Sequence, residues 1–176
     1  MAIIPTGWNF IRHLWKAMDR RHHSVTTAMH LGQNFDEDDN VVGVRPQAFE
    51  LRPDEPYLSS TWCEYFSGAQ DQQLRCAIEA IRNSNLKVGG KAQFAVGLVR
   101  EIRQLVDARP NAKKIRIIHE PEEDNEAHAA MRHWPESDVE LFDLLAQSVW
   151  SMLYNSEAAD ALPTSECACS ERGQGK

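Results

Sequence analysis

The sequence predicts an α+β protein: a single small domain with a three- to five-stranded sheet and two main helices. Apolar residues recur at helical spacing over 69–83, and a second amphipathic pattern extends over 138–155. Between these patterns, the β-branched run 114–118 is typical of a strand. We place these elements in one domain over residues 41–157.

The length and composition are those of an ordinary globular domain. The chain has 176 residues, of which 42% are hydrophobic and 26% charged. A chain of this size can bury a core without a disulfide or a metal, and its composition argues against wholesale disorder.

Membrane and secretion signals are not expected. The longest apolar stretch, 94–99, is far shorter than the ~20 residues of a membrane span, and the N-terminus lacks the basic and long apolar regions of a secretory signal. The four cysteines follow no zinc-finger or CxxC spacing. We therefore expect a reduced, cytoplasmic setting.

An amphipathic helical arm is predicted over residues 1–30, where apolar side chains recur at helical period. Such a helix could dock on its own core, lie in the groove of a partner, or rest on an anionic membrane. We favour a protein partner or self-association. The candidate contacts are Trp8, Ile11, Arg12, Trp15 and Lys16.

Two segments outside the domain are expected to lack regular structure. Residues 31–40 form an acidic linker, and their run of acids lacks the spacing of an EF-hand. Residues 158–176 are rich in Pro, Ser, Glu, Gly and Gln, and predict a disordered tail.

Short strands are predicted at the start of the domain. These cover 41–44 and 47–51, and prolines interrupt them. Thr61 and Glu64 have the spacing of a capping box, which predicts a short helix directing Trp62 inward. The helix 69–83 follows.

The second half alternates between strand and helix patterns. A strand over 92–99 leads into an irregular or helical piece that ends near 108, and the strand 114–118 follows a turn. Asp124 is a candidate cap for a short helix. Ser137 and Glu140 form a capping box that opens the helix 138–155.

Charge is arranged in blocks along the chain. Residues 65–117 carry ten basic and four acidic side chains, whereas residues 118–160 carry one basic and eleven acidic side chains. Such blocks can neutralise each other within the fold or leave charged faces for partners. The net charge of −7 disfavours a general nucleic-acid binder, although a local basic groove in 75–116 is possible.

One segment carries candidate chemistry. Two histidines flank five acidic side chains directly after the strand 114–118, and imidazole and carboxylate groups are ligands for divalent metals. A metal held there could activate a water for hydrolysis. An acidic loop that is solvated or binds a partner is the competing interpretation. The candidate ligands are His119, Glu120, Asp124 and His128.

The leading functional hypothesis is a non-enzymatic interaction protein, a subunit or adaptor of a cytoplasmic assembly, without a cofactor. The alternative is a small divalent-metal-dependent hydrolase or nuclease-like enzyme centred on the segment 119–128. The sequence contains no GxGxxG, GxxxxGK[ST] or GxSxG motif.

Overall fold

The fold is that of a computed structural model, which describes residues 23–28, 33–35, 41–110, 113–164 and 166–170. The proposed partner contacts at positions 8–16 lie outside these residues. None of the described helices has the length and apolar character that crossing a bilayer requires.

A six-stranded antiparallel sheet forms the centre of the molecule, in the order β6-β7-β4-β1-β5-β8. A separate pair joins β2 (Gln33–Phe35) and β3 (Val41–Val44). The strands of the main sheet are β1 (His23–Ala28), β4 (Tyr57–Trp62), β5 (Gln93–Leu98), β6 (Arg116–His119), β7 (His128–Arg132) and β8 (Met152–Tyr154).

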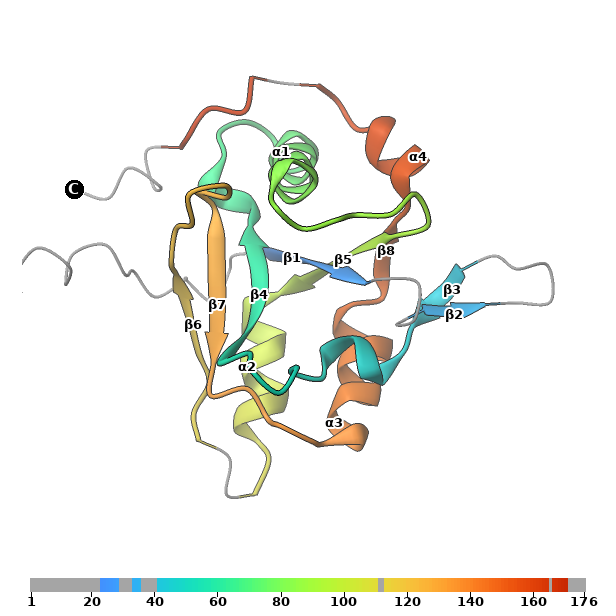
Figure 1. Ribbon diagram of the computed structural model, residues 1–176, viewed down its shortest axis with the longest axis vertical. Helices are drawn as coiled ribbons and strands as arrows, with labels where there is room; N and C mark the ends of the chain where they lie inside the picture. Colours follow the sequence, from blue (N-terminus) through green and yellow to red (C-terminus); the bar gives the residue numbers. More distant parts are fainter. Residues whose placement is uncertain (1–22, 29–32, 36–40, 111–112, 165, 171–176) are drawn as a thin grey trace, which may run out of the picture.

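Helices cover the sheet from two sides. Figure 1 shows α1 (Gln70–Asn83) on one side of the sheet, with α2 (Val99–Asp107) and α3 (Val139–Leu144) on the other. A π-helical turn, Leu145–Val149, continues α3, and α4 (Ser156–Asp160) follows β8. Two 3₁₀ turns, Pro46–Phe49 and Cys63–Tyr65, flank β4 along the chain.

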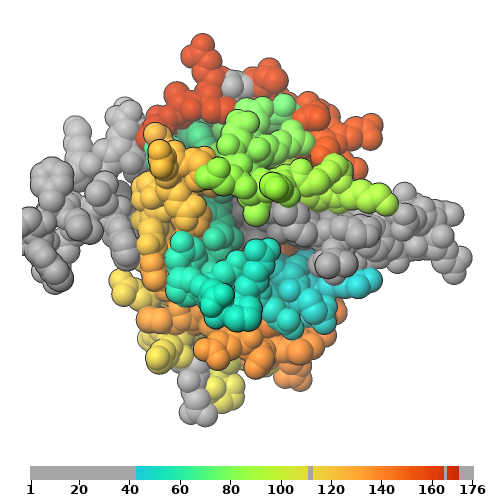
Figure 2. All heavy atoms as spheres, in the orientation of Figure 1, coloured from blue at the N-terminus to red at the C-terminus, as the bar shows by residue number. Residues whose placement is uncertain are grey.

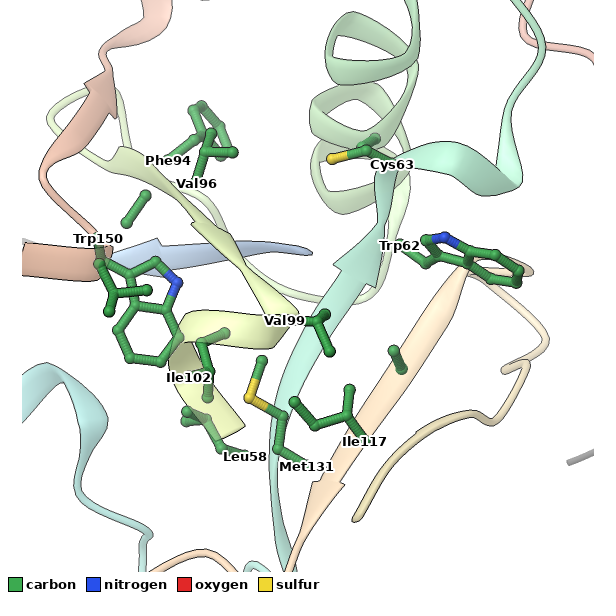
Figure 3. Packing of buried hydrophobic residues seen from close by; sticks show 14 of the residues in the cluster. Leu58, Trp62, Cys63, Phe94, Val96, Val99, Ile102, Ile117, Met131 and Trp150 are labelled. Carbon is green, nitrogen blue, oxygen red and sulfur yellow. The ribbon is translucent and has the colours of Figure 1, made fainter. Parts of the chain in front are cut away.

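The core lies between the sheet and these helices. Figure 3 shows Ile117 and Met131 of the sheet directed toward Val99 and Ile102 of α2, and all four side chains are fully buried. At an antiparallel pair such as Ile117 and Met131, both side chains point to the same face. The register of β6 on β7 therefore determines which residues enter the core.

The α+β class is confirmed, together with several elements. The helix predicted over 69–83 is α1, whose apolar face is buried. The strand predicted over 92–99 is β5, and it continues directly into α2. The strand predicted over 114–118 is β6, shifted by one or two residues.

The short helix expected after Thr61 is confirmed as the 3₁₀ turn Cys63–Tyr65, and Trp62 is buried, although Thr61 itself lies in β4 and no side chain caps the turn. Two other local predictions are wrong because sheet pairing prevails over local helix signals. The short helix after Asp124 is instead strand β7, whose alanines are completely buried between β6 and β4. The helix 138–155 is interrupted at Trp150, after which β8 pairs with β5.

The limits of the sheet also differ from expectation. The main sheet has six strands rather than three to five. Strands β7 and β8 form where helices are predicted, and β1 forms where the helical arm is predicted. Residues 23–28, expected in a helical arm, form a central strand. The main domain therefore begins before the acidic linker.

The C-terminal segment is also ordered further than predicted. Residues 156–160 form α4, and Cys167 is joined by a disulfide to Cys76 of α1. Backbone hydrogen bonds from Ser67 to Ala168 and from Ser170 to Tyr65 hold the same segment. Described residues beyond 158 are therefore part of the fold and are not a disordered tail.

Candidate functional site

The segment that joins β6 to β7, residues 120–127, is here called the β6–β7 connection. Glu122 and Asn125 exchange two backbone hydrogen bonds of 3.1 and 3.2 Å, so a two-residue turn closes the segment as a miniature hairpin. This geometry explains why Asp124 opens a turn and not a helix.

Two buried histidines hold the two ends of the connection. Nδ1 of His128 lies 2.8 Å from the carbonyl oxygen of Glu120, and Nε2 of His119 lies 2.7 Å from that of Glu126. Because a carbonyl oxygen only accepts, each of these ring nitrogens is the one that carries a proton. The histidines thus act as donors that pin the backbone.

The two rings lie in different surroundings. His119 packs against the rings of Trp62 and Tyr65, at centroid distances of 5.4 and 5.3 Å. Burial lowers the pKa of His119 below its usual value, more than its hydrogen bond to Glu126 raises it. His128 packs against Tyr57, and its Nε2 is buried without a hydrogen-bond partner among the described residues.

The acidic candidates also have partners inside the fold. Glu120 receives a bidentate contact from Arg132, with its closest N–O distance at 2.6 Å. Asp124 accepts a 2.6 Å hydrogen bond from the backbone N–H of Asn85, in the loop after α1. These contacts tie the connection to β7 and to the end of α1.

The structure therefore does not bring His119, Glu120, Asp124 and His128 together as a ligand set. Within the part of the chain that it describes, no three His, Cys, Asp or Glu side chains are placed to hold a metal ion. The reason is local: each of the four groups already bonds to a backbone group or to an arginine.

Several residues that build this site escaped the sequence analysis. Asn125 is buried and donates from Nδ2 to Oγ1 of Thr61 at 2.8 Å, while its Oδ1 accepts from the amide of Ala127. The two residues are far apart in sequence, so no local pattern could reveal the bond. Arg132 offered a signal, because it is the single basic residue among eleven acids in 118–160.

Three carboxylates of the connection remain at the surface: those of Glu122, Glu123 and Glu126. Tyr57 donates its hydroxyl to Glu122 at 3.3 Å, and Tyr65 donates to Glu126 at 3.0 Å. Burial raises the pKa of Tyr65 further than its hydrogen bonds do, so its hydroxyl stays a donor. The tyrosines therefore orient exposed charge without neutralising it.

Figure 2 shows the connection, in amber, at the surface beside the green loop that follows α1. The chain matches no protein-family model, no curated protein and no solved structure.

Proposed function

We propose that the protein is a non-enzymatic interaction protein, a subunit or adaptor of a larger assembly, and that the β6–β7 connection faces a basic partner. One observation carries the proposal. The groups that could have performed chemistry hold the connection in one conformation, while Glu122, Glu123 and Glu126 stay exposed. A rigid array of like charges loses little entropy when a complementary surface binds.

The alternative, a divalent-metal hydrolase, has less support. His119 and His128 each use one ring nitrogen on a backbone carbonyl, and Asp124 bonds to an amide. A metal would have to compete with these bonds, although Nε2 of His128 is buried without a hydrogen-bond partner among the described residues.

Partner contacts by the N-terminal residues Trp8, Ile11, Arg12, Trp15 and Lys16 remain part of the proposal. The cytoplasmic location is also a proposal, and the Cys76–Cys167 disulfide weighs against it, because such bonds persist mainly in oxidising compartments.

A decalysine peptide is a suitable probe of the acidic surface. The triple variant Glu122→Gln, Glu123→Gln, Glu126→Gln removes its three exposed charges, and glutamine can still accept the tyrosine hydrogen bonds. Fluorescence titration at about 50 mM salt should show about tenfold weaker binding, since each exposed ion pair contributes roughly 0.2–1 kcal/mol.

The matched control removes the same charge elsewhere, with Glu136→Gln, Asp143→Asn and Glu157→Gln, all exposed. This control should bind the peptide nearly as tightly as the unmodified chain, and therefore about tenfold more tightly than the first variant. Equal losses in both variants would show that net charge alone drives binding and would overturn the proposal. Stoichiometric Zn²⁺ binding in calorimetry, abolished by His128→Ala in a folded protein, would favour the hydrolase.

A further inference from the structure

Strand β6 is an edge of the main sheet, and among the described residues its one strand partner is β7. The amide of Glu120 donates to the carbonyl of His128. Since peptide groups alternate in direction along an antiparallel strand, Ile118 and Glu120 face β7, whereas Ile117 and His119 face away from it. Figure 1 shows β6 as the outermost strand beyond β7.

Opposite charges lie at the two ends of this edge strand. Lys113, Lys114 and Arg116 are exposed at its start. The exposed carboxylates of Glu122 and Glu123 follow its end. A strand with one sign of charge at each end is complementary to a second copy of itself that runs in the opposite direction.

We propose that two copies of this chain associate by antiparallel pairing of β6 with β6, with Ile118 of one copy opposite Ile118 of the other. This register pairs Ile117 with His119 of the second copy, and two such pairs can exchange four backbone hydrogen bonds. Continued beyond the strand, the same register brings Lys114 to the level of Glu122 and Lys113 to the level of Glu123 of the second copy. The inference rests on the proposed function and specifies the basic partner as a second copy.

Two features limit the number and the net gain of the backbone hydrogen bonds in this pairing. Pro121 has no N–H, so the backbone ladder ends before it. The carbonyl of Ile117 accepts from Arg103 at 3.4 Å, a long contact that an incoming amide would replace. The backbone contribution is therefore small, and the flanking charges determine how tightly and in which register the copies bind.

Sedimentation velocity of the full chain tests the pairing. At about 50 mM salt, the mass should approach twice 20.0 kDa as concentration rises, and about 500 mM salt should favour the monomer. Lys114→Glu and Glu122→Lys should each weaken association about tenfold, because every such change affects two symmetric contacts.

The double variant Lys114→Glu, Glu122→Lys should restore association, because opposite charges again meet at both contacts. The control Arg45→Glu, Glu157→Lys makes the same changes at exposed positions away from β6 and should leave association unchanged. Failure of the double variant to recover, or a monomer under all conditions, would overturn the inference. If the monomer still binds decalysine through the connection, the proposed function survives; if both vanish, both fail.

Discussion

Two buried regions of this protein are stabilised in different ways. One region, here called the aromatic cluster, consists of Phe49, Trp134, Phe142 and Trp150, which contact one another through their rings. The rings of Phe49 and Trp150 are stacked with their centroids 4.3 Å apart. The polar corner, defined as Thr61, His119, Asn125 and His128, is buried to a similar degree but is stabilised by directed hydrogen bonds.

The difference shows what each region can tolerate. The contribution of an apolar cluster scales with the area and volume that it buries, so truncation leaves a cavity and costs stability. A polar corner contributes little net energy, but it becomes costly when one partner of a bond is removed. The aromatic cluster therefore supplies stability, and the polar corner fixes a conformation.

The largest expected effect is in the apolar region. Leu145 is fully buried beside the aromatic cluster. Leu145→Ala should lower the free energy of unfolding of the protein by about 2–5 kcal/mol. The adjacent Leu144 is 44% exposed, and Leu144→Ala should cost less than about 1 kcal/mol. Urea denaturation measures both, and equal losses would show that the helix presents a different face.

The second effect concerns the disulfide bond between α1 and the C-terminal segment. Cys167→Ser removes the disulfide to Cys76, which closes a loop with a sequence separation of 91, and should cost about 2–4 kcal/mol. Cys169→Ser is the control, because Cys169 forms no disulfide. Thermal melts with and without reductant compare them; a reductant-insensitive melt of the unmodified chain would contradict the bond.

A smaller loss is expected inside the polar corner. Asn125→Ala leaves Oγ1 of Thr61 and the amide of Ala127 without their buried partner, at a cost of about 1–3 kcal/mol. Glu123→Ala, in the same turn but exposed, should change stability by less than about 0.5 kcal/mol. Equal small effects would mean that Asn125 does not hold the connection in place.

The smallest effect is a pH dependence. The pKa of His119 is lower in the folded chain than the ordinary value of 6.5, so the unfolded chain binds the proton more tightly. The contribution of His119 to folding stability is complete above pH 6.5 and is lost as the pH falls through the lower pKa of the folded state. His119→Gln should flatten the fall in stability between about pH 7 and 5, measured by urea denaturation at each pH.

The sequence predicted those elements whose local pattern agrees with their environment. In α1, the apolar face seen in the periodicity is the buried face, and β6 is β-branched where it enters the core. The prediction failed at β7, because the pair Ala129 and Ala130 favours a helix locally but fits between two strands.

The sequence indicated a polar segment after β6, but the use of its side chains could not be read from the sequence. The bonds of His119 and His128 go to backbone carbonyls, which carry no sequence signature. The bond from Asn125 to Thr61 joins residues 64 positions apart. Only the pairing of Arg132 with an acid was accessible from composition.

The central position of β1 has a consequence for how the chain folds during synthesis. β1 leaves the ribosome before any of its neighbours, yet it pairs with β4 and with β5, whose paired residues come 36 to 75 positions later. Contacts of such long range make folding slow. Both edges of β1 are open to wrong pairing until Tyr57–Trp62 has been synthesised, and one edge stays open until Gln93–Leu98 follows, so the nascent chain is most prone to aggregate during that interval.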